Sequence, residues 1–156
     1  MSRQVLRPQA PELDAFARLA RAHTILRREL ESEVLTPRGL TMSDFEALLH
    51  LSKADDTRLR RIDLADRLML TPSGVTRLLD GLGAAGLVEN VHCEDDARVT
   101  WACLTKEGAE TIQCVGVSHA KRLREIFEGA LSDAEVDQLH ELLGRLPGVG
   151  SGSCTG

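Results

Sequence analysis

The chain has 156 residues, 42% of them hydrophobic, and this length and composition suit one globular domain with a usable core. No apolar run approaches the roughly 20 residues that span a bilayer, so we expect no membrane partner. The formal net charge of −5 is unusual for a protein that binds nucleic acid. The four cysteines are irregularly spaced, which argues against a zinc ribbon or a secreted disulfide framework.

The first part of the chain is predicted to be mainly helical. Residues 1–11 contain two prolines and are expected to form a flexible arm; they lack a signal peptide's apolar stretch, so we expect a cytoplasmic protein. Residues 12–35 repeat apolar side chains at three- and four-residue steps, which predicts a long amphipathic helix. Thr36-Pro37-Arg38-Gly39 predicts its end. A capping box, Ser43-Asp44-Phe45-Glu46, predicts a helix through Lys53, followed by a polar connection over residues 54–60.

Two short helices joined by a tight turn are predicted next. The first covers Ile62–Leu70, and Thr71-Pro72 opens the second with an N-cap residue and a proline at the first helical position. The second helix is expected to bury one set of side chains and expose another. The apolar set is Val75, Leu78, Leu79 and Leu82, and the outward set is Ser73, Gly74, Thr76 and Arg77. This layout is typical of a helix-turn-helix, whose second helix enters the major groove of DNA.

A β-hairpin is predicted after this pair of helices. Gly86 ends the second helix, and Leu87–Val91 alternates as a strand does. Cys93–Arg98 forms a polar tip, and Val99–Leu104 is the returning strand. A helix-turn-helix followed by such a hairpin is a winged helix.

Two further helices are predicted at the C-terminal end. The first covers Glu107–Gly129, and a capping box formed by Ser132 and Glu135 starts the second. Residues 147–156 are expected to form a flexible tail. The apolar stripes of the terminal helices have no obvious partner within one small chain, which predicts a homodimer. A helical bundle that closes on itself is the alternative.

Several motifs resemble those of the MarR family of bacterial transcriptional regulators. They are Leu40-Thr41 with Phe45, Leu48 and Leu51, then Gly86-Leu87-Val88-Glu89, Asp96-x-Arg98 and Leu104-Thr105-x-x-Gly108. The resemblance covers residues 12–146 and implies a mainly α fold with a small β-hairpin wing. It implies that residues 12–35 and 107–146 are dimerisation helices, and that residues 41–105 form the winged helix that binds DNA.

The resemblance implies a ligand-responsive repressor that binds palindromic operators of double-stranded DNA as a homodimer. Arg77 suits guanine edges or phosphate equally well, and Arg98 suits a narrow minor groove with Asp96 orienting it. Arg58 and Arg61 are candidate phosphate contacts, and ordinary solvated positions are the alternative for all of these groups. The expected DNA-binding residues are Arg58, Arg61, Pro72, Ser73, Gly74, Thr76, Arg77, Asp96 and Arg98.

Charge is distributed unevenly along the predicted winged helix. From residue 58 to 82, five arginines outnumber three aspartates, a local balance of +2. In contrast, Glu94-Asp95-Asp96 precede the single Arg98 of the wing. Binding to phosphate is therefore expected to be modest and sensitive to salt. Two alternatives remain: a winged helix that binds protein with weak or no DNA binding, and a structural dimer with vestigial DNA binding.

Candidate ligand-binding residues lie on the long helices. Phe16, His23, Arg27 and His119 are expected near a site for a small organic effector, which the resemblance suggests is aromatic or anionic; histidines that only satisfy hydrogen bonds are the alternative. The histidines show no metal-binding spacing, and no cofactor is expected. Enzyme motifs such as G-x-S-x-G and the P-loop do not occur, so no catalytic residue is assigned. Cys103 and Cys114 are expected to be buried, and no cysteine lies in the first helix, where related thiol sensors have theirs.

Overall fold

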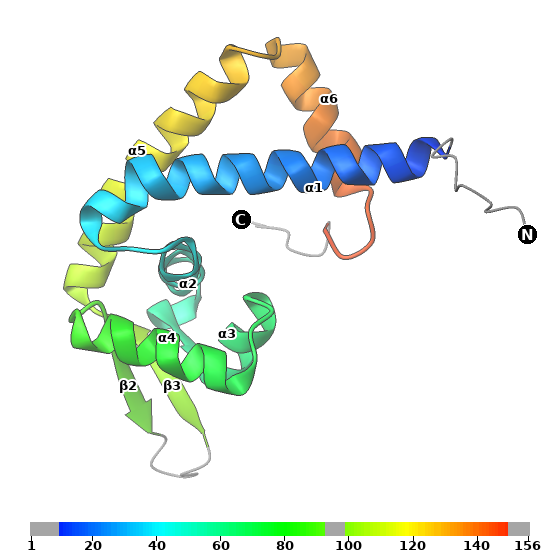
Figure 1. Ribbon diagram of the computed structural model, residues 1–156. Helices are drawn as coiled ribbons and strands as arrows, with labels where there is room; N and C mark the ends of the chain where they lie inside the picture. The colour runs from blue at the N-terminus through cyan, green and yellow to red at the C-terminus, as the bar shows by residue number, and fades with distance from the viewer. Residues whose placement is uncertain (1–9, 93–98, 150–156) are drawn as a thin grey trace, which may run out of the picture. The chain divides into compact units, whose positions relative to one another are not determined.

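The computed structural model describes residues 10–92 and 99–149, which fall into two compact units. Unit 1 runs to Gly116 and unit 2 begins at Val117. Figure 1 shows the order of the elements along the chain, from α1 in blue to α6 in orange. No helix within the described ranges is long and apolar enough to cross a membrane.

The first predicted helix changes its geometry before it ends. The α-helix α1 covers Pro11–Leu30, and a π-helical turn, η1, continues it over Glu31–Leu35. A 3-10 turn, η2 at Thr36–Arg38, and Gly39 with a φ of 70° then end the helical path, as predicted for this sequence. The helix expected over residues 12–35 therefore exists, but its last five residues are wound more widely than an α-helix.

The second helix begins earlier than its predicted capping box. Helix α2 covers Met42–Ser52 with Thr41, not Ser43, as the N-cap. The Asp44 carboxylate accepts from the Thr41 backbone N–H at 2.8 Å, and the Asp44 N–H donates to Thr41 Oγ1 at 3.2 Å. The prediction was wrong by two residues because Thr41-x-x-Asp44 forms the same reciprocal pair as a Ser and Glu would.

The winged helix contains three strands, one more than predicted. Strands β1 (Arg58–Arg60), β2 (Val88–His92) and β3 (Thr100–Leu104) form an antiparallel sheet in the order β1-β3-β2. The residues expected as a polar connection therefore include the short turn η3 (Asp55–Thr57) and strand β1. Three residues are too few to show a clear alternation in the sequence. The predicted hairpin is present as β2 and β3, while its tip, residues 93–98, lies outside the described residues.

The helix-turn-helix is formed by α3 (Arg61–Arg67) and α4 (Pro72–Ala84). The turn between them ends α3 with two backbone bonds, from Leu70 N–H to Ala65 O at 2.9 Å and from Met69 N–H to Asp66 O at 3.1 Å. This is a Schellman pattern in which Met69 takes the left-handed conformation with a φ of 51°. Leu64, Val75 and Leu79 of the two helices are buried.

The start of α5 (Lys106–Glu128) is fixed directly to the winged helix. Thr105 Oγ1 donates to Gly86 O at 2.7 Å and accepts from Gly108 N–H at 3.0 Å. Gly108 lies so close to Leu87 that a Cβ built on it would be 2.1 Å from Leu87 O. Only glycine fits this position, which accounts for the Leu104-Thr105-x-x-Gly108 motif in physical terms.

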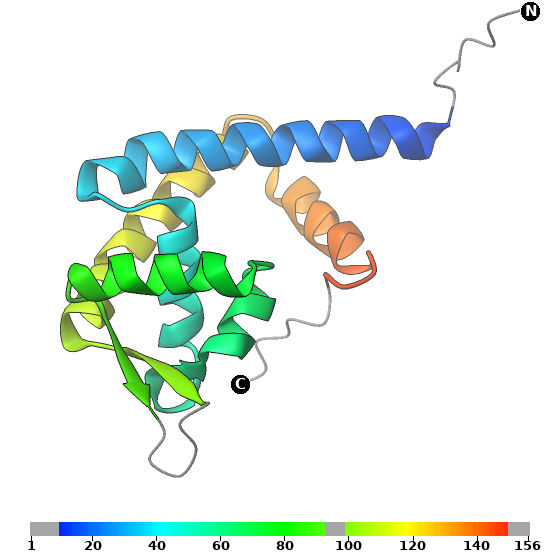
Figure 2. The same ribbon diagram turned by 60° about the horizontal axis from the view of Figure 1, so that its bottom comes forward.

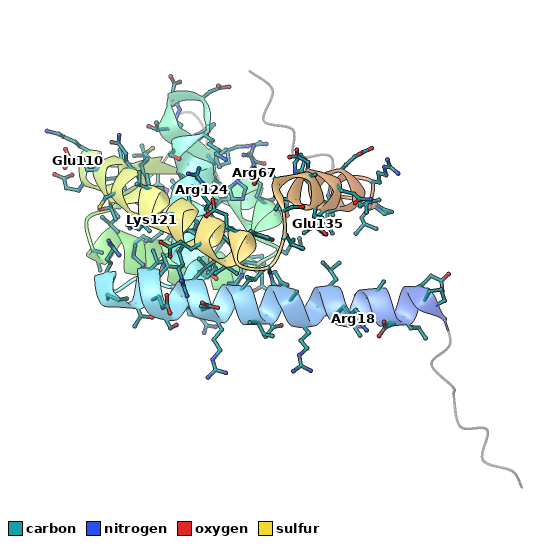
Figure 3. All side chains as sticks on the ribbon, turned by 90° about the horizontal axis from the view of Figure 1, so that it is seen from above. Arg18, Arg67, Glu110, Lys121, Arg124 and Glu135 are labelled. Atoms are coloured by element: carbon teal, nitrogen blue, oxygen red, sulfur yellow. The ribbon has the colours of Figure 1, made fainter. Side chains whose placement is uncertain are left out.

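Unit 2 contains the rest of α5 and helix α6 (Asp133–Gly144). The predicted capping box is confirmed, since the Glu135 carboxylate accepts from the Ser132 N–H and hydroxyl, each at 2.8 Å. These bonds to Ser132 lower the pKa of Glu135, which Figure 3 marks at the start of α6. No residue of α6 is buried in the single chain.

Candidate nucleic-acid interface

Helix α4 lies on the surface of unit 1, with the β2–β3 hairpin starting beside its C-terminal end and extending away from the helices (Figures 1 and 2). Thr71 caps the helix, because its Oγ1 accepts from the Gly74 N–H at 3.1 Å, and Pro72 follows at the first helical position. Ser73 and Arg77 are exposed one turn apart, while Val75 and Leu79 anchor the opposite side in the core. The helix therefore offers a polar first turn to a partner.

Thr76 and Gly74 face the protein more than the sequence suggested. The Thr76 hydroxyl donates to Pro72 O at 2.8 Å within its own helix and lies 3.4 Å from Arg61 Nη1. A Cβ built on Gly74 would lie 3.2 Å from Thr71 Oγ1, so this glycine faces the helix cap. Gly74 and Thr76 are half-exposed, so they lie less outward than Ser73 and Arg77, and their contact with DNA stays a prediction.

The arginines of the winged helix differ in their partners. Arg60 makes a two-pronged ion pair with Asp63, at 2.7 and 3.0 Å, and this hydrogen-bonded carboxylate raises the pKa of Arg60. Arg58 lies 3.4 Å from an Asp56 oxygen and stacks 4.9 Å from the centre of the Trp101 ring. In contrast, Arg77 is exposed and makes no ion pair with any described residue.

Arg61 has two partners within the winged helix. Its Nη1 points to the Thr76 hydroxyl and its Nη2 to the Thr100 hydroxyl, each at 3.4 Å. These contacts join α3 to both α4 and β3. The expected wing residues Asp96 and Arg98 lie outside the described residues.

A hollow of about 420 Å³ lies along the C-terminal part of α1. It brings together His23 and Arg27 of the expected ligand residues, while Phe16 is exposed elsewhere on α1 and His119 lies in unit 2. Arg27 Nη1 pairs with Glu46 Oε1 at 3.1 Å. The other lining residues escaped the sequence analysis, although they follow four-residue steps in two neighbouring rows, one through His23 and Arg27 and one that starts at Thr24. They are Thr24, Arg28, Glu31, Ser32 and Thr36.

The cysteines are more accessible than predicted. Cys114 is exposed on α5, and Cys103 is half-buried on β3. Burial raises the pKa of the Cys103 thiol, although the nearby Arg58 opposes this effect. Because of the raised pKa, less of the reactive thiolate is present. Within the part of the chain that the structure describes, no three His, Cys, Asp or Glu side chains gather in a way that would hold a metal ion.

Comparison with known proteins extends the description of the fold. The sequence profile of the MarR family matches residues 38–99, which run from the last residue of η2 to the residue before β3. The HTH-type transcriptional repressor YetL of Bacillus subtilis is 35% identical over 109 residues, covering 70% of this chain and 65% of YetL. AbsC, a MarR family transcriptional regulator of Streptomyces coelicolor, is 31% identical with a TM-score of 0.76, covering 91% of this chain and 93% of AbsC.

A second Streptomyces coelicolor protein shows the same fold. Sco3205, a MarR family transcriptional regulator whose structure was solved in complex with DNA, has a TM-score of 0.76 at 23% identity. The match covers 90% of this chain and 88% of Sco3205, so it includes the terminal helices as well as the winged helix.

Proposed function

Because the chain belongs to the MarR family of transcriptional regulators, we propose that it binds palindromic operators of double-stranded DNA as a homodimer and represses transcription. The observation that carries this proposal is the polar first turn of α4, where exposed Ser73 and Arg77 stand opposite a buried apolar face. YetL is named a transcriptional repressor, which supports repression as the direction of regulation. The Sco3205 complex supports DNA as the partner.

The exposed side chains of α4 also favour DNA over the alternative, a protein partner. A winged helix that binds protein would be expected to present an apolar patch on this helix. The exposed side chains of its first three turns are instead polar or small, with Ser73, Arg77 and Asp80 among them. This surface suits base edges and phosphates better than a protein interface.

Exposed apolar side chains on the terminal helices support a homodimer. Leu13 and Phe16 of α1 are 60% and 69% exposed, and Leu142 of α6 is 49% exposed. Figure 3 shows side chains projecting along α1, among them that of Arg18. Apolar surface of this kind needs cover in water, and a second copy of the same helices supplies it. We therefore assign residues 12–35 and 107–146 to dimerisation and residues 41–105 to DNA binding.

A comparison of two arginines tests the DNA site. The duplex used as operator is the one that the wild-type protein selects from a randomised library. Arg77→Ala is expected to weaken operator binding by about 1–3 kcal/mol and to reduce discrimination at one symmetric base position. Arg60→Ala is the matched control, because Asp63 already neutralises that guanidinium. Binding is measured by fluorescence anisotropy; equal losses for the two variants, or failure to select any sequence, would contradict the proposal.

The hollow along α1 supports a second part of the proposal, that a small organic anion regulates DNA binding. His23, Arg27 and Arg28 place basic groups in one hollow, although Glu31 is also present and Glu46 already pairs with Arg27. We expect aromatic carboxylates to lower operator affinity in a titration, and Arg28→Ala to raise the concentration needed. Arg18→Ala is the control, since Arg18 is exposed and lies outside the hollow. A repressor indifferent to every such compound would be a constitutive DNA binder.

A further inference from the structure

A chain of hydrogen bonds crosses the winged helix from the recognition helix to the hairpin. The Thr76 hydroxyl of α4 donates to Pro72 O at 2.8 Å and lies 3.4 Å from Arg61 Nη1. Arg61 Nη2 lies 3.4 Å from the Thr100 hydroxyl of β3, which in turn lies 3.3 Å from His92 Nδ1 of β2. One guanidinium thus joins α4 to both strands of the hairpin.

Thr100 is the buried link in this chain. It is 6% exposed and is the one polar side chain among the buried residues that the structure describes. A guanidinium only donates, so the Thr100 hydroxyl accepts from Arg61 and keeps its own proton to donate, while the direction of its bond to His92 Nδ1 is set by the histidine tautomer. His92 accepts this bond when its ring proton is on Nε2. Each group then has the partner that its chemistry requires, which is the condition for a polar link in a core.

The two contacts of Arg61 set it apart from an arginine that binds phosphate. Both of its terminal nitrogens point toward threonine hydroxyls of the protein, whereas Arg77 has no ion pair with any described residue. A planar guanidinium holds its donors at fixed angles, so two contacts at once fix the relative placement of the groups that accept them. A lysine ammonium at the same position keeps the positive charge but lacks the two terminal nitrogens that donate in fixed directions.

We propose that Arg61 is a positioning residue that fixes the β2–β3 hairpin against recognition helix α4, and does not act as a phosphate contact. The inference rests on the proposed function, because it concerns how the same winged helix tells an operator from other DNA. Reading a sequence needs α4 and the hairpin in one arrangement, while binding to phosphates tolerates small displacements. Loss of the link should therefore reduce operator affinity and leave affinity for random DNA unchanged.

Three variants test the link against a phosphate contact. Thr100→Val removes the buried hydroxyl without changing any charge, Thr100→Ser keeps the hydroxyl, and Arg61→Lys keeps the charge. Affinity for the selected operator and for a scrambled duplex of equal composition is measured at several salt concentrations. We expect Thr100→Val and Arg61→Lys each to weaken operator binding about five- to tenfold, because each disrupts the hydrogen bond that joins Arg61 to Thr100. Thr100→Ser should bind as the wild type does.

The double variant Arg61→Lys/Thr100→Val should bind no more weakly than either single variant, because both remove the same link. Scrambled DNA should be bound equally by all variants, with an unchanged salt dependence. An Arg61→Lys protein with wild-type affinity, together with an Arg61→Ala protein whose salt slope falls by about one, would make Arg61 a phosphate contact and overturn the inference. If the wild-type protein selects no sequence at all, it is the proposed function that fails.

Discussion

The winged helix and the terminal helices use the same kind of amphipathic pattern with different results. In α4 Val75 and Leu79 are each 1% exposed and Leu82 is 2% exposed, while Leu78, also expected to be buried, is half-buried. In α6 the apolar positions repeat in the same way, yet no residue of the helix is buried and Leu142 is 49% exposed. The winged helix therefore supplies its own core, whereas we propose that a second copy of the chain covers α6. A periodic pattern predicts a helix but does not say which molecule covers it.

The largest effect is expected in the core of the winged helix. Leu79→Ala should lower the free energy of unfolding by about 2–5 kcal/mol, because it removes a buried side chain and leaves a cavity. The loss should be the same at every protein concentration, since the core lies within one chain. Chemical denaturation monitored by circular dichroism measures it. A loss that changes with concentration would show that this core also depends on the dimer.

The terminal helices should behave in the opposite way. Leu142→Asp places a charge where the proposed dimer buries an apolar side chain, so association should weaken about tenfold or more. Sedimentation at micromolar concentration should then show material near the 17.0 kDa mass of one chain, against about twice that mass for the wild type. Gln138→Asp, an exposed position of the same helix, is the control for added charge. A stable wild-type monomer would remove the contrast between the two regions.

The smallest effect concerns pH and one histidine of α2. Burial lowers the pKa of His50, the charges of Arg67 and Lys53 lower it further, and Glu46 opposes them. The unfolded chain then binds a proton more readily than the folded chain, so stability should fall as the pH drops below about 6.5. His50→Gln should flatten the dependence of unfolding free energy on pH between 7 and 5. His140→Gln, a change on exposed α6, should leave the pH dependence as it is in the wild type. Equal slopes for the wild type and the two variants would contradict the role assigned to His50.

The sequence predicted most of the winged helix because its signals are local. Thr71-Pro72 specifies a helix start within two residues, and Ser132 with Glu135 does so within four; both are confirmed. The missed strand depends on a partner distant in sequence. Strand β1 exists because Leu59 pairs with Ala102, more than forty residues away, and three residues show no period of their own.

The candidate site was predicted less completely than the fold. Residue type and helix periodicity suggested Ser73 and Arg77, and the structure leaves both exposed. Periodicity could not show that Arg61 contacts Thr100, 39 positions along the chain. It also could not show that Gly74 faces its own helix cap, because that depends on the Thr71 side chain.

The close approach of Gly108 to Leu87 has a mechanical consequence. A Cβ built on Gly108 would lie only 2.1 Å from Leu87 O and 2.8 Å from Leu104 Cδ1, so the backbone of α5 begins in direct contact with the backbone at Leu87. Thr105 adds bonds to Gly86 and Gly108 at the same point. A small movement of the first turn of α5 is therefore transmitted almost fully to the start of β2, since packed groups transmit strain. The start of α5 and the start of β2 are therefore held rigidly together, whereas a longer loop between them would let the two elements move independently.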